Sequence, residues 1–326
     1  MRLNTSYEQF LSSEGPRAYL QKKIDRAESF RLLPPLAQLV ASSREMARSG
    51  DRNGIDGAIK TFLEGDTHFI LDCMRDWIRE AAEDDKTLPP FREAIEFDSG
   101  LFHNVNLLKK FGISLTVSSI SERDVAASRA RGEATRVVFS GQQIFFKFLA
   151  GDNVSLTIWE CDRYDDGADF PRHRCWKARD VRIVPGDILE IDGSYQSLSF
   201  GACEGTAVFL QAENLTKDIG TSVAFDTSGS FVATYPTDRT ALRRMVMCSA
   251  LKHMGADVRL GELPSTARDG PFYLRWHFLR EAVAAAPTEQ MDLLANVSAN
   301  DPNPSVRRAA SATLEMVRKR SARHVN

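Results

Sequence analysis

The chain has 326 residues, of which 43% are hydrophobic and 26% are charged, and its formal net charge at pH 7 is −2. This is the composition of an ordinary globular protein, long enough for two or three structural units. Because the net charge is close to zero, the molecule as a whole has no electrostatic attraction to nucleic acid or to anionic membranes, and we expect neither as a partner. No apolar run approaches the roughly 20 residues of a membrane-spanning helix.

The cysteines and the start of the sequence bear on the compartment. The five Cys residues are scattered and odd in number, which argues against a framework of disulfides and indicates a reducing environment. The sequence begins MRLNTSYEQF, without the basic segment and apolar run of a secretory signal peptide. We therefore expect a cytoplasmic protein.

Residues 1–111 are expected to be helical. The clearest pattern lies in residues 66–84, where apolar side chains recur at helical spacing from Ile70 to Trp77. Asp66 is suited to cap the N-terminus of this helix, because its carboxylate can accept hydrogen bonds from free backbone N–H groups.

After Gly112 the apolar period changes from helical to alternating, which predicts strands. Segments rich in β-branched and aromatic residues then follow at short intervals, separated by turn residues. The predicted strands are residues 113–117, 137–139, 144–149, 154–161, 181–183, 188–191, 207–212, 223–225 and 231–235. Ser121 to Asp124 form a capping box, which predicts one short helix among them. So many short strands are typical of a β-sandwich or small barrel.

One stretch, residues 181–200, carries a family resemblance. It reads VRIVPGDILEIDGSYQSLSF, with turn signals at PGD and at DG. The stretch resembles the second half of a cupin, a small jelly-roll barrel in which a PGD turn precedes a strand ending in P-x-G and a metal-binding His follows. Here Gly193 is kept, but Asp precedes it and Gln196 stands where that His would fall. The resemblance implies a cupin-like β unit around residues 135–213.

The same resemblance implies where a ligand would bind. Cupin metal sites take two His and a Glu from one motif, and here only Glu160 and His173 are placed to imitate that set. His173 and Cys175 alternate as they would in a strand, so both are expected to point inward. We predict a ligand pocket formed by Glu160, His173, Cys175 and Gln196. We expect no metal and no cofactor in it, because the amide oxygen of Gln196 is a poor ligand for soft metals.

The segment at residues 160–176 is rich in aspartate, and two interpretations remain open. A metal site would need several of these carboxylates to converge with His173. The favoured interpretation is a solvated acidic loop beside a structural histidine, since aspartate is mostly exposed in folded proteins.

The helical period returns after Asp238, which is suited to cap a helix. That helix carries apolar residues on two sides, including Met247 and Leu251, which predicts that it is well covered. A second amphipathic stripe contains Trp276, and the adjacent His277 is interpreted as a packed side chain of the same helix.

Residues 301–310, DPNPSVRRAA, carry a second resemblance. They are similar to the start of the second helix of a HEAT-type repeat, which implies a HEAT-like region at residues 288–320. One such repeat cannot bury its own apolar face, so it should stack on the helices before it. The candidate interaction surface of this region is Trp276, His277, Arg307 and Arg308.

The expected fold is α+β. A central cupin-like β-sandwich or barrel (residues 112–236) is flanked by a helical N-terminal region (1–111) and a HEAT-like helical C-terminal region (237–326). No nucleophile elbow, phosphate-binding loop or zinc-protease motif occurs, so we expect a non-catalytic protein. Its expected partner is a protein, a peptide or a small molecule, and homo-oligomerisation is left open. The alternative is a divergent cupin metalloenzyme, similar to an iron-dependent oxygenase, that uses Glu160 and His173.

Overall fold

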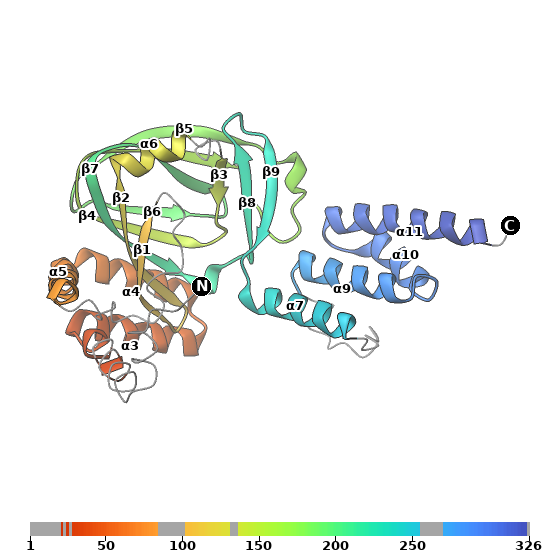
Figure 1. Ribbon diagram of the computed structural model, residues 1–326, viewed down its shortest axis with the longest axis horizontal. Helices are drawn as coiled ribbons and strands as arrows, with labels where there is room; N and C mark the ends of the chain where they lie inside the picture. Colours follow the sequence, from red (N-terminus) through yellow and green to blue (C-terminus); the bar gives the residue numbers. More distant parts are fainter. Residues whose placement is uncertain are drawn as a thin grey trace, which may run out of the picture.

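The computed structural model describes residues 21, 24–25, 28–83, 102–130, 136–254 and 270–324. Helices lie toward both ends of the chain and antiparallel sheets lie between them (Figure 1). The described helices are α3 (Pro34–Ser49), α4 (Arg52–Glu64), α5 (His68–Glu83), α6 (Glu122–Ala130), α7 (Arg239–His253), α9 (Phe272–Ala285), α10 (Met291–Asn300) and α11 (Pro304–His324). None of them is both long and apolar enough to cross a membrane.

The strands form two sheets. They are β1 (His103–Lys110), β2 (Ile113–Ser121), β3 (Arg136–Phe139), β4 (Gln143–Cys161), β5 (Cys175–Ile183), β6 (Ile188–Asp192), β7 (Gln196–Asn214), β8 (Thr221–Asp226) and β9 (Phe231–Pro236). The larger sheet has the order β1-β2-β7-β4-β5, with β6 also paired to β4, and the smaller sheet has the order β3-β8-β9. All of these pairings are antiparallel. The mixture of helices and antiparallel sheets expected from the sequence is therefore confirmed.

Strands β4 and β7 form the axis of the larger sheet. Their register runs from Gln143 opposite Asn214 to Glu160 opposite Gln196, with several register shifts in the middle. The sequence pattern predicts two strands here, separated by a turn at residues 151–153, and this prediction is wrong. The chain continues as one bent strand, because register shifts and positive φ angles at Gly151 (+130°) and Asn153 (+48°) absorb the irregularity without ending the pairing.

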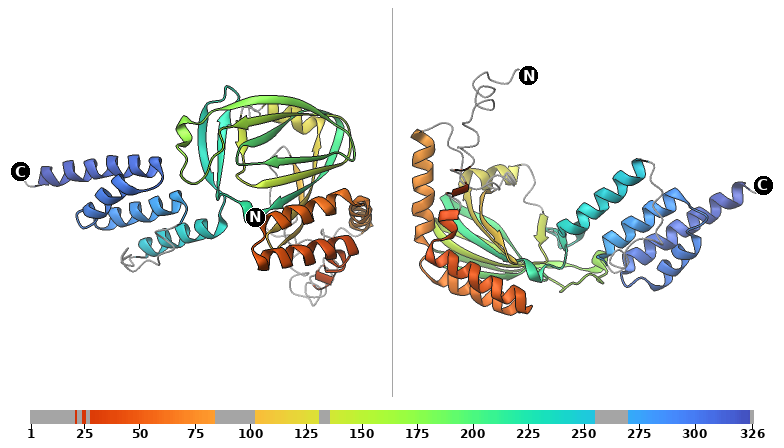
Figure 2. Two further views of the ribbon diagram at one scale, coloured as in Figure 1. Left: turned by 180° about the vertical axis from the view of Figure 1, so that it is seen from behind. Right: turned by 90° about the horizontal axis from the view of Figure 1, so that it is seen from below.

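One face of the larger sheet is covered by α3 and α4 (Figures 1 and 2). Side chains alternate across a strand, so Phe145, Lys147 and Leu149 of β4 share this face. Phe145 and Leu149 belong to the buried apolar cluster that contains the inner sides of the helices. The Lys147 ammonium donates hydrogen bonds to the carbonyls of Leu63 and Gly65, which satisfies acceptors left free at the C-terminus of α4.

Strand β1 corrects the predicted helical region. We expect helices throughout residues 1–111 from the sequence, but residues 103–110 pair with β2 across a turn at Phe111 and Gly112. The sequence Asn-Val-Asn-Leu at residues 104–107 has the strand period, and pairing with β2 supplies the hydrogen bonds that make it a strand. The part of the expected helical region at residues 84–100 lies outside the described residues.

The turns predicted on either side of β6 are confirmed. The Asp187 carboxylate accepts a hydrogen bond from the backbone N–H of Val184, which closes the PGD turn. In the second turn, the N–H of Gly193 donates to the carbonyl of Gln142 at 2.8 Å. A Cβ atom on Gly193 would collide with the backbone of Gln142 and with the Ser140 hydroxyl, so this close approach requires glycine.

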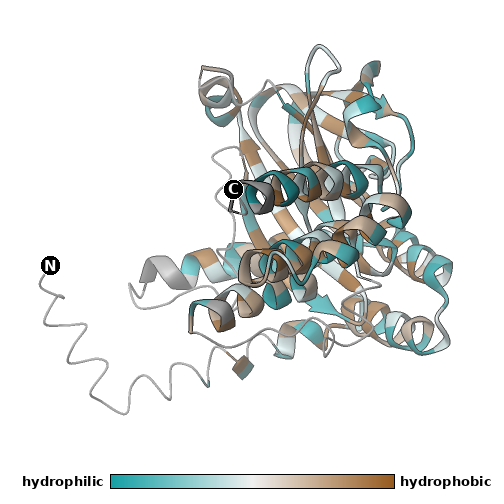
Figure 3. Cartoon of the chain, turned by 90° about the vertical axis from the view of Figure 1, so that its right-hand side faces the viewer, coloured by the Kyte–Doolittle hydropathy of each residue, from teal (hydrophilic) through white to brown (hydrophobic). Residues whose placement is uncertain are grey.

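The C-terminal helices pack on one another and project away from the β unit (Figures 1 and 2). Helices α9, α10 and α11 share an apolar cluster of Leu279, Val283, Leu294, Ala310, Leu314 and Val317. Helix α7 packs on α9 through Ala241, Cys248, Leu274 and Phe278. Apolar and polar positions alternate around these helices, as the hydropathy colouring shows (Figure 3). The packing of α9, α10 and α11 is as expected, whereas their likeness to a HEAT-type repeat stays a prediction.

Helix α7 is less covered than its sequence indicated. Asp238 caps its N-terminus as predicted, by accepting hydrogen bonds from two backbone N–H groups. The expectation that both apolar sides are covered is wrong, since Val246 is 69%, Met247 63% and Leu251 46% exposed. Within the described residues α9 packs on only one side of α7, and the other side faces solvent.

The loop between β4 and β5 joins the C-terminal helices to the β unit. Its Asp166 carboxylate accepts a hydrogen bond from the backbone N–H of Phe272, the first residue of α9, at 3.1 Å. Its Asp169 carboxylate forms an ion pair with the guanidinium of Arg308 in α11, through two hydrogen bonds of 2.7 and 3.1 Å. The amide of Asn303, just before α11, donates to the Asp166 carbonyl at 2.7 Å. This segment is therefore a docking loop, and the expectation that it is simply solvated is wrong.

Arg275 lies at the centre of this junction. Its side chain is 13% exposed and donates hydrogen bonds to both carboxylate oxygens of Asp301, whose side chain is 6% exposed. The same guanidinium contacts the Asp166 carboxylate at 3.3 Å and donates to the carbonyl of Gly270. Two buried opposite charges with these additional hydrogen bonds fix the orientation of α9 relative to both α11 and the docking loop.

We predict that Asp301→Ala lowers the free energy of unfolding by about 3–5 kcal/mol, because the Arg275 charge would be left enclosed with only Asp166 as a partner. Urea denaturation measures the loss. The control is Glu315→Ala, which removes an exposed partner of Lys319 on α11 and should leave the stability unchanged. Equal, small effects of the two substitutions would contradict the structural role of the Arg275 pair.

Candidate functional site

The interior face of the β unit contains a pocket of about 180 Å³. Strand β7 supplies much of its lining, and β3, β4, β6 and the residue before β1 supply the rest. The lining residues are Phe102, Val138, Ser140, Ile144, Phe146, Ile191, Gln196, Ser197, Leu198, Phe200, Phe209 and Gln211. Apolar and amide side chains thus meet in one hollow, on the face of the larger sheet opposite to α3 and α4.

Phenylalanine side chains form the apolar wall of this pocket. The rings of Phe200 and Phe209 are stacked, with centroids 5.5 Å apart and planes at 25°. Phe146 lies 5.9 Å from Phe209, and Phe102 contacts Phe200 edge-on at 5.4 Å. Because these rings pack against one another, their orientations are fixed. The apolar surface that they form is therefore suited to contact a flat apolar group of a ligand.

The polar part of the lining consists of two serines, Ser140 and Ser197, and two glutamines, and neighbouring glutamates fix how the glutamines point. The amide nitrogen of Gln196 donates to the Glu160 carboxylate at 3.2 Å, and that of Gln211 donates to the Glu213 carboxylate at 2.7 Å. In both pairs the hydrogen bond runs from the NH₂ group of the glutamine to an oxygen of the glutamate, so each amide turns its NH₂ group toward its glutamate. The amide oxygens of Gln196 and Gln211 are then the acceptors left for a ligand that donates hydrogen bonds.

Glu213 is a titratable group of this face whose charge is affected by its surroundings. It pairs with Ser114 of β2 on one side and with Ile144 of β4 on the other. Burial raises the pKa of the Glu213 carboxyl, while the hydrogen bond from Gln211 and the nearby charge of Lys109 act in the opposite direction. The net direction is upward, so the interior of the β unit disfavours the ionised form.

The structure brings only part of the predicted ligand set together. Glu160 and Gln196 lie opposite each other in the β4–β7 pair and are hydrogen bonded, and Gln196 lines the pocket. Cys175 pairs with Cys161, on the other face from Glu160, and both thiols are buried between the docking loop and the smaller sheet. Burial raises the pKa of the Cys175 thiol to about 11, which makes it an inert packing group.

His173 lies outside the pocket, and the expectation that it points inward beside Cys175 is wrong. It follows the short 3₁₀ turn Phe170–Arg172, because strand β5 begins only at Cys175. Its Nδ1 atom is 3.3 Å from the carbonyl of Asp162, and its ring lies beside that of Phe170. In this position His173 acts as a structural side chain of the docking loop.

The phenylalanine wall and the pair of Gln211 with Glu213 are not among the site residues predicted from the sequence. Phe209, Gln211 and Glu213 are spaced by two residues in β7, so all three face the interior. The stretch AVFLQAEN carries this signal, although its alternation by itself predicts only a strand. Phe146 lies on β4 and reaches Phe209 through the β4–β7 pairing, whereas Phe200 lies on β7 itself and meets Phe209 because that strand curves.

The residues of the β unit do not fit the metal centre that the cupin resemblance implies. The part of the chain that the structure describes has no group of three or more His, Cys, Asp or Glu side chains that could hold a metal ion. Glu160 is engaged by Gln196, while His173 lies in the docking loop. A transition-metal centre needs at least three converging protein ligands, and this donor set does not provide them.

The predicted interaction surface on the C-terminal helices is largely used inside the protein. His277 is buried, with Nε2 donating to the Met245 carbonyl at 3.1 Å, so it does not belong to a surface. Arg307 donates to the carbonyl groups of Asp301 and Pro302, and Arg308 pairs with the docking loop. Trp276 is half-buried against the cluster of α9, α10 and α11. A role for the exposed part of Trp276 in binding stays a prediction.

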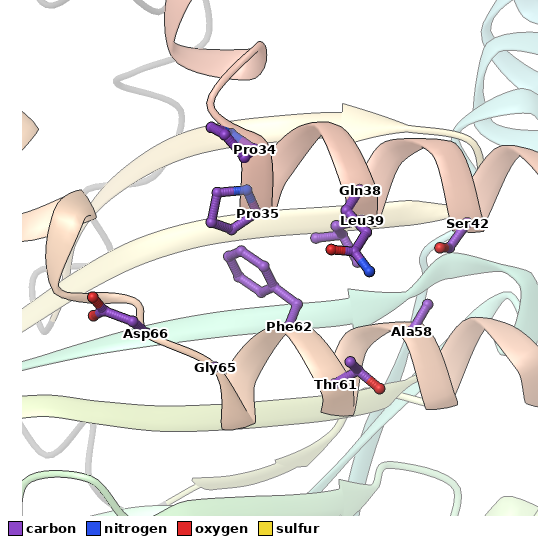
Figure 4. Close-up of a pocket in the computed structure, with 10 residues that line it drawn as sticks. All are labelled: Pro34, Pro35, Gln38, Leu39, Ser42, Ala58, Thr61, Phe62, Gly65 and Asp66. Carbon is purple, nitrogen blue, oxygen red and sulfur yellow. The ribbon is translucent and has the colours of Figure 1, made fainter.

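A larger hollow of about 370 Å³ lies between α3 and α4 (Figure 4). Phe62, Leu39 and Pro35 give it an apolar side, and Gln38 and Thr61 lie at its rim. No hydrogen bond within the described residues holds the Gln38 or Thr61 side chain in place. Specific sites orient their polar groups by packing and secondary hydrogen bonds, so the smaller β pocket is the better candidate despite its size.

Comparison with known proteins gives similarity to solved structures only. No protein-family model matches the chain. No curated protein matches it either. Similar solved structures include ectoine synthase from P. lautus (14% identity, 36% of this chain and 67% of that chain, TM-score 0.22) and the Clostridium difficile EutQ protein (13%, 35% and 67%, TM-score 0.21). Another is a sugar phosphate isomerase from Silicibacter pomeroyi, described as belonging to a cupin superfamily (16% identity, 42% of this chain and 78% of that chain, TM-score 0.22). Similarities this low transfer neither an activity nor a site residue to this chain.

We predict that the stability difference between Glu213→Gln and the wild-type protein depends on pH. In the unfolded chain the pKa of a glutamate is about 4.3. Because the pKa of Glu213 is raised in the folded protein, the folded protein keeps this proton to a higher pH than the unfolded chain does. Stability therefore falls as the pH rises from the unfolded to the folded pKa, and a glutamine escapes that loss. The variant should match the wild type near pH 4 and exceed it in free energy of unfolding at pH 8.

Urea unfolding at the two pH values tests this, with Glu204→Gln as the control, since Glu204 is an exposed glutamate on the same strand. A Glu213→Gln variant that loses stability at pH 8 would show instead that Lys109 and the hydrogen bonds stabilise the carboxylate.

We also predict that untagged protein purifies with far less than one equivalent of iron, zinc, manganese or nickel, because the potential ligands do not converge. Elemental analysis measures the content, and EDTA should leave the melting temperature unchanged. One equivalent of tightly held metal that is lost on His173→Ala would contradict the assignment of His173 as a structural residue.

Proposed function

We propose that this chain is a non-catalytic binding protein whose β pocket takes a small ligand with one ring and hydrogen-bond donors. The observation that supports it most directly is the pairing of a phenylalanine wall with two glutamines that are oriented by glutamates. The ring would lie against Phe200 and Phe209, and the donors would meet the amide oxygens of Gln196 and Gln211. Such a division between apolar walls and a few placed polar groups is the usual composition of a small-molecule site.

The volume of the pocket limits the ligand to about one ring. An apolar cavity of about 150 Å³ in a protein core accommodates a benzene molecule. The β pocket, at about 180 Å³, leaves room for one or two further atoms that carry the donor groups. The pocket lining contains no lysine or arginine, so nothing in it would neutralise an anionic ligand.

The oxygenase alternative has no specific observation in its favour. It would require Glu160 and His173 to share a metal ion with a third ligand, and the described residues do not offer that third ligand. The proposed partner is therefore a small molecule, and the proposed location is the cytoplasm. All five cysteines are free, which suits a reducing compartment.

We predict that benzyl alcohol, which has a ring and a hydroxyl donor, binds the wild-type protein and that Val138→Trp abolishes this binding. Val138 lines the pocket and is 47% exposed, so an indole in its place would occupy the entrance without filling the core. Isothermal titration calorimetry or ligand-observed NMR measures the affinity.

The matched control is Val184→Trp, since Val184 is 57% exposed and lies outside the pocket, at the turn after β5. It should bind benzyl alcohol as the wild type does. Toluene, which has the ring but no donor, should bind more weakly than benzyl alcohol. Wild-type protein that binds neither compound, or Val138→Trp that binds as well as Val184→Trp, would rule out the β pocket as a ligand site.

A further inference from the structure

A third hollow, separate from the β pocket, lies between α3 and β1. Its volume is about 340 Å³, which falls within the range of small-molecule sites. Its lining residues are Glu28, Arg31, Leu32, Ala37, Val40, Ala41, Arg44, Leu108 and Lys110. We call it the α3–β1 cleft. Apolar side chains and three cationic side chains line it, against a single carboxylate.

The secondary structure explains why these residues face one cleft. Ala37, Val40, Ala41 and Arg44 are spaced by three, one and three residues, so they lie along one side of α3. Leu108 and Lys110 are two residues apart and therefore share a face of β1. Arg31 closes the helical turn that precedes α3. Cations thus come from three places in the chain that are brought together only by packing of α3 on the sheet.

The three cations of the cleft lack the carboxylate partners that the arginines at the docking loop have. Arg275 and Arg308, for example, each form ion pairs with aspartates of the docking loop. Within the described residues, Arg31, Arg44 and Lys110 form no ion pair. The Nε atom of Arg31 is buried and has no hydrogen-bond acceptor. An enclosed donor on a cation without an acceptor is costly, and an anion in the cleft would remove that cost.

The turn between β1 and β2 holds two of the cations near each other. Phe111 has a φ angle of +49°, a left-handed conformation that is unfavourable for a residue with a Cβ atom. The Arg44 guanidinium lies 4.6 Å from the centre of the Phe111 ring, and this cation–π contact holds Arg44 beside the residue that follows Lys110. Arg44 and Lys110 both line the cleft, and an anion bound between them would offset the repulsion of their like charges.

We propose that the α3–β1 cleft binds an amphipathic anion, a small molecule that joins a carboxylate or phosphate group to an apolar chain. Arg31, Arg44 and Lys110 contact the anionic group, with guanidinium N–H groups donating hydrogen bonds to its oxygens. The apolar chain lies along Val40, Ala41 and Leu108, and the exposed Leu32 side chain covers its outer end. This site is independent of the β pocket and takes an anionic ligand, whereas the ligand proposed for the β pocket is a neutral hydrogen-bond donor.

The test compares octanoate with octanol and octylamine, which have the same chain but a neutral or a cationic end. Isothermal titration calorimetry on the full-length protein should show octanoate binding at least roughly tenfold more tightly than octanol, the smallest gain expected from charge-assisted hydrogen bonds. Octylamine should bind most weakly. Octyl phosphate and inorganic phosphate, added in separate titrations, distinguish a phosphate from a carboxylate preference and show whether the chain is needed.

Single variants locate the site. Arg44→Gln and Lys110→Gln should each weaken octanoate binding several-fold and leave octanol binding unchanged, since they remove charge but keep a polar side chain. The control is Arg48→Gln, an exposed arginine in the last turn of the same helix that does not line the cleft. Benzyl alcohol binding in the β pocket should be unaffected by all three. The proposal is overturned if octanoate does not bind, if octanol binds equally well, or if Arg48→Gln has the same effect as Arg44→Gln.

Discussion

The antiparallel pairing of β4 with β7 is the constraint on which the rest of this structure depends. Each strand has 19 residues, and together they run through the larger sheet from end to end. Because side chains alternate across a strand, the pair serves two cores at once. Phe145 and Leu149 face the helices, whereas Phe146 and Phe209 face the interior pocket. A shift of one residue in this register would exchange the two faces and destroy both.

The bend in the β4–β7 pair is as important as its length. Register shifts around Gly151 let one strand follow the curve of the β unit without ending its hydrogen bonding. A Cβ atom on Gly151 would lie against Ala207 of β7, so glycine also permits the strands to stay close where they bend. The curved sheet is then concave on the side of the pocket, and it offers its other side to α3 and α4 (Figure 2).

Charge is distributed in three different ways across the molecule. At the docking loop, aspartates neutralise Arg275 and Arg308, and the pairs hold the C-terminal helices to the β unit. In the β pocket, Glu160 and Glu213 orient two glutamines, so acidic groups act indirectly through neutral amides. In the α3–β1 cleft, the cations have no carboxylate partner among the described residues. The first arrangement is structural, and the other two leave hydrogen-bonding capacity for ligands.

The sequence alone determined the local structure of this protein wherever neighbouring residues supply the stabilising contact. The capping box at Ser121 and Asp124 and the cap at Asp238 form as predicted, since each side chain bonds to backbone only two or three residues away. The turn at Gly193 and the hairpin of β8 and β9 were likewise predictable from turn residues and alternation.

Only the tertiary structure decided which residues distant in sequence come into contact, and the candidate sites depend on those contacts. Strand β1 could not be separated from a helix until β2 was there to pair with it. The aspartates of the docking loop predict a solvated segment when only neighbouring residues are considered, because their arginine partners lie more than 100 residues later in the chain. Likewise, no local pattern links Phe146 to Phe200, or Arg31 to Lys110. Hydrogen-bond periodicity and capping act over a few residues and can be read in sequence, whereas packing and ion pairing join residues at any separation.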